Sequence, residues 1–279
     1  MPIDPELLDA LRLERLPDGR YRGTHAAGGG GRVVFGGQLL AQVVMAAAAA
    51  VPDKSVKSVQ VVFVRGASLE EPVTLGVELM HSGRLYSSAT VDVRQGDRLC
   101  VRALVLLDRP DVELARHGPE MPVVDGPEGS TPAGAFALGG AEIRIAGNVD
   151  LDDRAVTGPP QVSVWVRFPG APPGEALSRA LLAYACEPFF FGASLRPHPG
   201  LSQASAYREV VPAVLTHSLH YHAPFSASEW LLLDLGSPHV GRGRIYGYGS
   251  VFTLGGELVV SVNQENQLRP MREGAAASA

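Results

Sequence analysis

The chain has 279 residues, of which 46% are hydrophobic and 19% are charged, and its formal net charge is −5. This composition excludes a disordered chain, and the absence of any Lys/Arg block argues against a nucleic-acid partner. No membrane span is expected, because the alanine run 46–50 is too short and ends at Pro52. Two cysteines outside any C-x-x-C pair and an acidic N-terminus without a signal-peptide pattern favour a cytoplasmic location.

The first half of the chain reads as helical segments followed by a run of strands. A short helix is expected at 7–16, and the glycine run 28–31 is expected to form a loop. Gly36-Gly37-Gln38 then opens an apolar helix that ends near Ala50. β-Branched content and glycine turns predict an antiparallel meander with strands at 56–65, 73–82, 85–95 and 98–107.

The second half repeats this order after a stretch rich in Pro, Gly and acidic residues. The predicted elements are strands at 141–146 and 161–168, a helix at 175–186, and strands at 213–222, 230–235, 242–253 and 257–268. We therefore expect a first domain over 1–110, a linker over 111–140, a second domain over 141–272 and a flexible tail over 273–279.

The two halves also correspond residue by residue. The segment 58–68 aligns with 216–226, and the segment 84–93, which ends in a Gln95-Gly96 turn, aligns with 243–252, which ends at Gly255-Gly256. Copies of this length are too large for a solenoid repeat and fit a tandem pair of small domains. A duplicated unit of helix and sheet points to a functional site between the copies.

Several segments together resemble the type II acyl-CoA thioesterases, in order and over nearly the whole chain. They are RVVFGGQ at 32–38, the helix end from Tyr184 to Glu187, LRPH at 195–198, HSLHYHAPF at 217–225, EWL at 229–231 and Gln264-Glu265. The resemblance implies an α+β double hotdog, in which two antiparallel sheets each wrap a central helix and fuse into one continuous sheet. It also implies cleavage of fatty acyl-CoA to free acid and coenzyme A, no metal or redox cofactor, and further assembly into a homo-oligomer.

The family resemblance implies an active site made of an aspartate, a serine or threonine, and a glutamine that together activate a water. The aspartate position falls on Glu187, which keeps the carboxylate, and the glutamine position falls on Gln264. The hydroxyl position falls on Val214, whose side chain forms no hydrogen bonds. Because strand side chains alternate, Thr216 is expected on the same face as Val214 and is our candidate replacement.

Further candidate residues follow from the chemistry of thioester hydrolysis. The helix start at Gly37 and Gln38 offers backbone N–H groups as oxyanion donors. Phe189 and Phe190 follow Glu187 directly and, with Val214, are expected to line the acyl pocket. Guanidinium groups suit the phosphates of coenzyme A, and the candidates are Arg65, Arg84 and Arg244.

Two alternatives to a thioesterase stay open. Because Val214 lacks the hydroxyl of the family, one alternative is a double-hotdog protein that binds acyl-CoA without hydrolysing it. A hydratase or dehydratase of enoyl thioesters would need a histidine near Glu187, and His220 is its candidate. The histidines at 217, 220 and 222 do not predict a zinc site, since only two share a strand face, and His217 and His222 are interpreted as structural.

Overall fold

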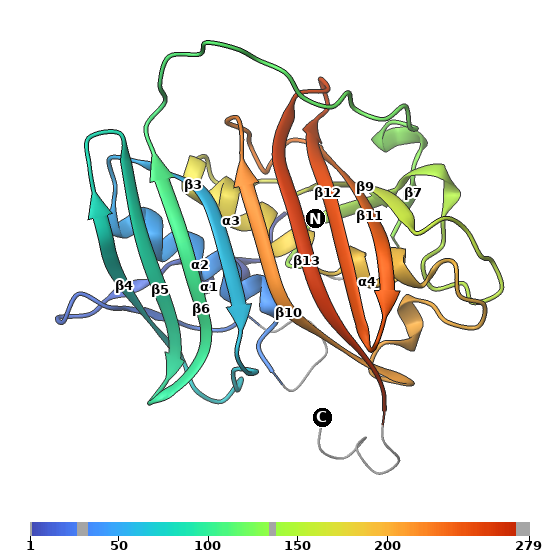
Figure 1. Cartoon of the computed structure of the whole chain (residues 1–279), viewed down its shortest axis with the longest axis horizontal. Helices are drawn as coiled ribbons and strands as arrows, with labels where there is room; N and C mark the ends of the chain where they lie inside the picture. The colour runs from blue at the N-terminus through green and yellow to red at the C-terminus, as the bar shows by residue number, and fades with distance from the viewer. Residues whose placement is uncertain (1, 27–32, 134–137, 272–279) are drawn as a thin grey trace.

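A computed structural model describes residues 2–26, 33–133 and 138–271 of the chain. Its main feature is one antiparallel sheet of 13 strands in the order β1-β2-β4-β5-β6-β3-β10-β13-β12-β11-β9-β8-β7. Strand β3 of the first half pairs with β10 of the second, so the sheet runs without a break through both halves (Figure 1). The predicted glycine loop and C-terminal tail lie outside the described residues.

The first half contains two helices and six strands. Their bounds are α1 (Pro5–Leu11), β1 (Glu14–Arg15), β2 (Tyr21–Gly23), α2 (Gly36–Ala50), β3 (Ser55–Phe63), β4 (Val73–Ser82), β5 (Tyr86–Gln95) and β6 (Arg98–Asp108). The predicted helix 36–50 and strand 73–82 match α2 and β4 at both ends. The first helix is shorter than expected, and the short strands β1 and β2 were not predicted.

The second half begins beyond a stretch without helix or strand that runs from the end of β6 past the ends of the central strands (Figure 1). Its elements are η1 (Pro127–Gly129), β7 (Thr131–Pro132), β8 (Glu142–Ile145), η2 (Ala146–Asn148), β9 (Gln161–Arg167), α3 (Glu175–Cys186), α4 (Phe189–Leu195), η3 (Gln203–Ser205), β10 (Val210–Tyr221), β11 (Leu231–Gly241), β12 (Arg244–Thr253) and β13 (Leu258–Pro270). The predicted helix 175–186 matches α3, whereas α4 was missed.

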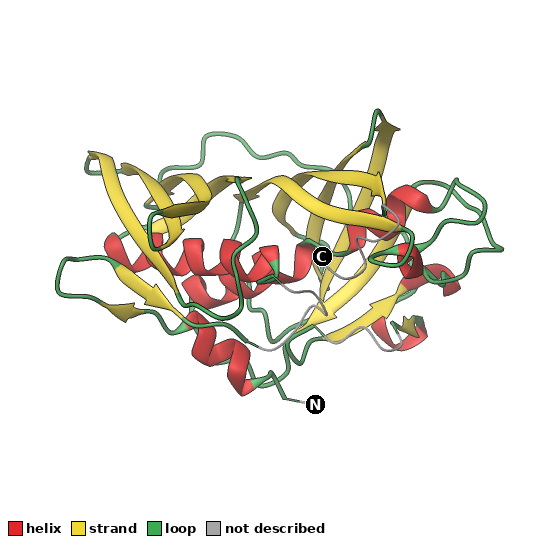
Figure 2. Ribbon diagram, turned by 90° about the horizontal axis from the view of Figure 1, so that it is seen from below, coloured by secondary structure: helices red, strands yellow, loops and turns green. Residues whose placement is uncertain are grey.

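Helices α2 and α3 lie side by side beneath the arched sheet (Figure 2). Leu, Val and Ala side chains of both helices belong to one large buried cluster with the inward side chains of the strands. The helices approach closely at one end: a Cβ on Gly37 would lie 2.6 Å from the Tyr184 carbonyl oxygen, a contact that only glycine permits. Because Tyr184 lies near the end of α3, the start of α2 meets the end of α3.

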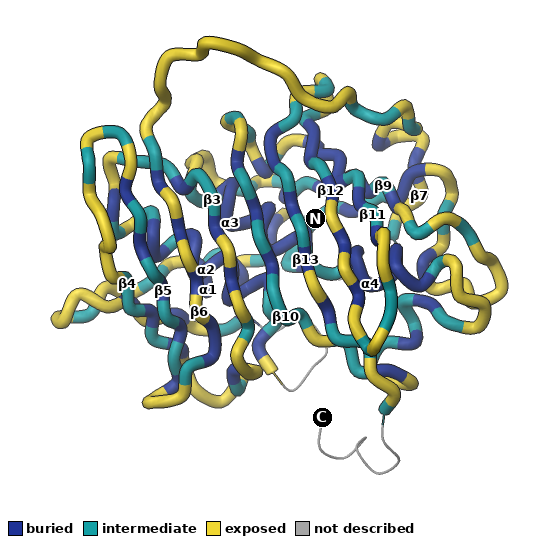
Figure 3. Tube along the Cα trace, viewed as in Figure 1, coloured by how far each residue is buried: buried dark blue, intermediate teal, exposed yellow. Residues whose placement is uncertain are grey.

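The strands alternate between a buried inner face and a more exposed outer face, as Figure 3 shows along the central strands. At the junction of the halves, Val61 lies opposite His217, and Val59 lies opposite Leu219. A two-fold axis between these strands, which exchanges β3 with β10, therefore relates Val59 to His217 and Val61 to Leu219. This approximate two-fold relation agrees with the internal repeat read from the sequence.

A break in strand register occurs at matching places in both halves. In the first half the pairing of β3 with β6 shifts between Val56 and Ser58. In the second half the pairing of β10 with β13 shifts between Val214 and Thr216. Such a bulge puts an extra residue into one strand and reverses the alternation of the side chains that follow it.

Candidate active site

Glu187 lies where helix α3 ends and turns into α4. Pro188 follows it, and proline favours the end of a helix because it lacks the N–H that the next helical hydrogen bond needs. The residue as a whole is part-exposed, but its Oε2 atom is enclosed and has no hydrogen-bond partner among the described residues. A carboxylate oxygen is thus held inside the protein at the junction of the halves.

The start of α2 forms one wall around this carboxylate. A Cβ on Gly36 would lie 2.7 Å from Oε2, so glycine leaves room for the acid. Burial raises the pKa of Glu187 to about 8, and a hydrogen bond from the Gly37 backbone N–H opposes part of that shift. An acid in this range exchanges protons near neutral pH, which is what a general base requires.

Gln264 lies on the inner face of β13 and is fully buried. Its Nε2 donates to the Glu187 backbone oxygen at 3.0 Å and to Asn266 Oδ1 at 2.7 Å. Its Oε1 has no partner among the described residues. The two donated bonds fix the amide, so that Oε1 faces away from these partners with its lone pairs unused.

The register shift in β10 separates Val214 from Thr216. Val214 lies opposite Asn266, which is buried, whereas Thr216 lies opposite the exposed Glu265. Thr216 also lies opposite Val62, which is 53% exposed on the outer face. The expectation that Thr216 shares a face with Val214 is therefore wrong, because the bulge reverses the alternation between them.

His217 is the inner-face residue that the sequence reading treated as structural. It lies opposite Gln264, is fully buried, and its ring packs edge-on against Phe190 with centroids 6.4 Å apart. Burial lowers its pKa to about 3, so the imidazole is neutral. Both ring nitrogens lack partners among the described residues, and this pair of orphaned atoms becomes visible only once the strand is folded.

His220 does not approach the carboxylate as a hydratase would need. It lies opposite Ser58 and Ser261, and Ser58 in turn lies opposite Leu106, which is 37% exposed on the outer face. His220 follows the inner-face residue His217 by three positions, so strand alternation also places His220 on the outer face. The sequence feature that supported an enoyl-thioester reaction is therefore absent from the inner face.

The two expected oxyanion donors differ in their surroundings. The Gly37 N–H faces the Glu187 carboxylate and opposes part of the rise in its pKa, and the Gln38 N–H donates to the Phe35 carbonyl oxygen at 3.0 Å. The Gln38 side chain is also engaged, since its Oε1 accepts from the Ala26 N–H at 3.1 Å. The prediction of a free N–H at Gln38 is wrong, because that group closes the first turn of the helix, whereas the role of Gly37 stays a prediction.

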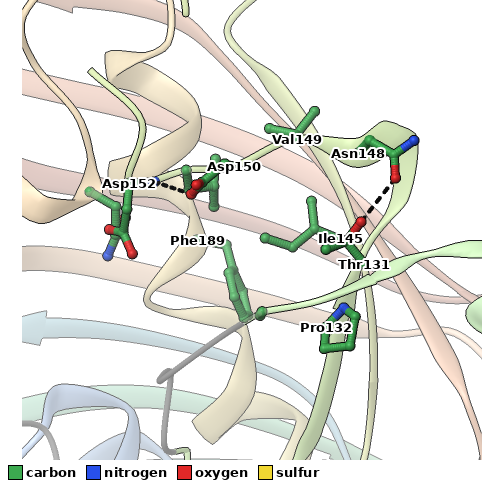
Figure 4. A pocket seen from close by; sticks show the side chains of 11 residues that line it. Thr131, Pro132, Ile145, Asn148, Val149, Asp150, Asp152 and Phe189 are labelled. Carbon is green, nitrogen blue, oxygen red and sulfur yellow. Dashed lines mark hydrogen bonds between the residues drawn. The ribbon is translucent and has the colours of Figure 1, made fainter. Parts of the chain in front are cut away.

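The two phenylalanines after the acid take different positions. Phe190 packs beneath β12, where a Cβ on Gly247 would lie 2.4 Å from its ring. Phe189 lines a cavity of about 270 Å³ together with Ile145 and Val149, and acidic side chains lie at another part of its wall (Figure 4). The cavity is thus lined in part by apolar side chains, and Glu187 is not among its lining residues.

The three candidate arginines are exposed but lie at different ends of the sheet. Arg65 follows β3, and Arg244 begins β12, both beyond the row that contains Gln264. Arg84 lies in the β4–β5 hairpin, roughly 20 Å away along the strands. Arg84 thus lies at the opposite end of the sheet from Arg65 and Arg244, so the three arginines do not form one group.

Other kinds of site are not evident in the part of the chain that the structure describes. There, no group of three or more His, Cys, Asp or Glu residues is arranged to hold a metal ion. Both cysteines are buried and free. None of the described helices has the length and apolar character to span a membrane.

Comparison with protein families gives two matches that divide the chain as its two halves do. The model of the acyl-CoA thioesterase N-terminal domain matches residues 25–107, and that of the acyl-CoA thioesterase C-terminal domain matches residues 116–268. The second match alone covers more than half of the chain.

Similar proteins and structures cover almost all of it. Acyl-coenzyme A thioesterase 8 of Mus musculus is 28% identical over an alignment that covers 93% of this chain and 87% of that protein. Acyl-CoA thioesterase 2 of Haemophilus influenzae is 25% identical over 94% of this chain and 96% of its own. The crystal structure of acyl-CoA thioesterase II TesB2 from Mycobacterium marinum has a TM-score of 0.80 and 27% identity, covering 96% of this chain and 99% of that one.

Proposed function

Since the chain belongs to the acyl-CoA thioesterase family, we propose that it hydrolyses fatty acyl-CoA to free fatty acid and coenzyme A in the cytoplasm. The observation that carries this proposal is the hydrogen bond of 3.0 Å from Gln264 Nε2 to the Glu187 backbone oxygen. It ties the Gln264 amide to the backbone of Glu187, and these two residues correspond to the family's glutamine and aspartate. No cofactor is part of the proposal.

In the proposed reaction the Glu187 carboxylate takes a proton from a water while the water oxygen attacks the thioester carbon. The oxyanion that forms then collapses, the carbon–sulfur bond breaks, and the coenzyme A thiolate receives the proton from Glu187. A free acid and a thiol result, so one water is consumed per thioester. A positioned base of this kind contributes about 10²- to 10⁴-fold to a rate.

Two features of the protein suit the two parts of an acyl-CoA substrate, its acyl chain and its coenzyme A phosphates. The cavity beside Phe189 offers apolar space to an acyl chain. Arg65 and Arg244 lie exposed at the same end of the sheet, where they can meet the phosphates of coenzyme A. Each additional buried methylene of the chain is worth about 0.8 kcal/mol, so the size of the apolar space determines the preferred length.

A second candidate function is acyl-CoA binding without turnover, and Val214 is the observation that favours it. This residue lies on the inner face opposite Asn266 and supplies no hydroxyl at the family's third catalytic position. The same carboxylate and apolar space would then serve to hold a thioester rather than to cleave it.

The deciding experiment is release of coenzyme A thiol from acyl-CoA esters of increasing chain length. We expect turnover by the native chain and a loss of 10²-fold or more, as an order of magnitude, in both Glu187→Ala and Gln264→Ala. Phe189→Ala, which enlarges the cavity beside Phe189, serves as a test of the acyl pocket, with a shift toward longer chains as its expected result. Tight acyl-CoA binding without turnover by the native chain would instead establish the binding protein.

A further inference from the structure

His217 occupies a position that puts an imidazole among the catalytic groups. It lies on the inner face of β10, opposite Gln264 on one side and Val61 on the other. The ring of Phe190, three residues beyond Glu187, packs edge-on against it at 6.4 Å. The elements that hold Glu187 and Gln264 thus also surround this ring.

Four enclosed polar atoms in this region have no hydrogen-bond partner among the described residues: both ring nitrogens of His217, Gln264 Oε1 and Glu187 Oε2. A buried donor or acceptor without a partner costs about 1–3 kcal/mol. The structure therefore concentrates unmet hydrogen-bonding capacity at one place, whereas Gln264 Nε2 beside it has two partners.

The fold itself does not require a histidine here. The two-fold relation between the halves maps His217 onto Val59, which is also fully buried on the inner face. A valine therefore satisfies the same backbone position in the same kind of core. An imidazole that gains no protein hydrogen bond is costly to bury, so a packing role does not account for it.

The hydrogen-bonding capacities of these atoms complement those of one water molecule. Burial keeps the imidazole neutral, so it has one N–H donor, while Gln264 Oε1 and the ionised Glu187 Oε2 are acceptors. A water donates its two protons to these oxygens and accepts the N–H in one lone pair. Its second lone pair stays free to attack a carbonyl carbon.

We propose that His217 is a further catalytic residue, whose ring N–H holds the attacking water against Glu187 and Gln264. This role rests on the thioesterase function proposed above. It supplies the donor that a hydroxyl would supply at Val214, and which Thr216 does not supply because the bulge turns it to the outer face. During attack the water proton passes to Glu187, and His217 keeps its own proton.

The test compares His217→Val, His217→Gln and His220→Val in the full chain. Valine is the residue at the two-fold-related position, glutamine keeps an N–H donor, and His220 lies on the outer face of the same strand. We expect kcat for acyl-CoA to fall about 100-fold in His217→Val, with partial recovery in His217→Gln and no change in His220→Val. The Kd of a non-hydrolysable thioether analogue of acyl-CoA should stay within about twofold, since His217 contacts water and not the substrate.

The results that overturn the inference are distinct from a failure of the proposed function. An active native chain with unchanged kcat in His217→Val, or with kcat and analogue binding lost together in both His217 variants, removes the role of His217 alone. A native chain without turnover removes the thioesterase function and this role with it. If His217→Val does not fold, a high-resolution crystal structure of the native chain decides, with one water expected about 3 Å from all three side chains.

Discussion

The two ends of the α2–α3 helix pair share one backbone plan and differ in their side chains. At one end the residue after α3 is an acid, and polar side chains follow on the inner face: Glu187, His217 and Gln264. At the other end the two-fold relation gives valine at each corresponding position: Val51 after α2, Val59 on β3 and Val105 on β6.

All three valines are buried, and the bulge is present at both ends. The valines of the apolar end show that the backbone plan does not need polar side chains at these three positions, although Arg179 of α3 is buried at the same end and donates to the Val56 carbonyl oxygen. Whatever the polar end adds to it therefore costs burial free energy, and the reason for its presence is chemical. The comparison teaches that the two copies of the fold differ at three equivalent positions, and that only one of them carries the side chains of the proposed site.

The largest expected effect on kcat comes from replacing Gln264 with valine, the residue at the two-fold-related position 105. Gln264→Val should lower kcat about 100-fold, because it removes both the amide that holds the Glu187 backbone and the free Oε1. Val105→Ile at the apolar end is the matched control and should leave kcat unchanged. Steady-state thiol release checks both variants, and equal losses in the two would break the distinction between the ends.

The pH dependence of turnover should report the acid that only one end possesses. Burial raises the pKa of Glu187 to about 8, and only the ionised form accepts a proton. We therefore expect kcat to rise roughly tenfold per pH unit up to about pH 8 and to level off above it. A rate that is flat from about pH 6 to pH 9 would contradict Glu187 as the base.

A smaller effect is expected in the acid stability of the polar end. The folded pKa of His217 is about 3, below its ordinary value of 6.5. Its contribution to stability is thus present above pH 6.5 and is lost as the pH falls toward 3, because the unfolded chain takes up the proton first. His217→Val should remove about 2 kcal/mol of the loss between about pH 7 and pH 5.

Urea unfolding of the native chain and of His217→Val at both pH values measures this difference. His220→Val is the control, because its ring lies on the outer face and should leave the slope of stability against pH unchanged. Identical slopes in the native chain and in His217→Val would mean that the imidazole titrates in the folded protein near its ordinary pKa.

The smallest expected effect is a rise in kcat on substitution of Val214. Val214→Thr restores a hydroxyl to the inner face with almost the same shape, and we expect kcat to rise a few-fold at about 1 kcal/mol of transition-state stabilisation or less. Val56→Thr places the same hydroxyl at the corresponding position of the apolar end and should have no effect on kcat. Thiol release from one acyl-CoA at saturation checks the pair, and a decrease for Val214→Thr would show that water is already fully held.

Much of the fold was predictable, because apolar periodicity and glycine turns specify long elements well. The two central helices were located to the residue, and the β3–β10 junction pairs the segments that the repeat had aligned. The pairing of Glu187 with Gln264 also followed, though through family resemblance and not from spacing along the chain.

The bulge and its consequences were not predictable from these patterns. An extra strand residue has no side-chain signature, so the alternation rule was carried through Val214 and Thr216 as if the register were regular. The importance of His217 was missed for a related reason. An orphaned ring nitrogen is a property of the surroundings of a side chain, and those surroundings come from strands and helices far away in sequence.

The connection from β6 to the second half joins both halves in one chain, and this affects how activity depends on protein concentration. The start of α2 and the end of α3 belong to different halves, and they meet within one polypeptide. Tethered partners stay at a high effective concentration however few molecules are present. The proposed site therefore assembles once, during folding, and specific activity per chain should be the same at nanomolar as at micromolar protein.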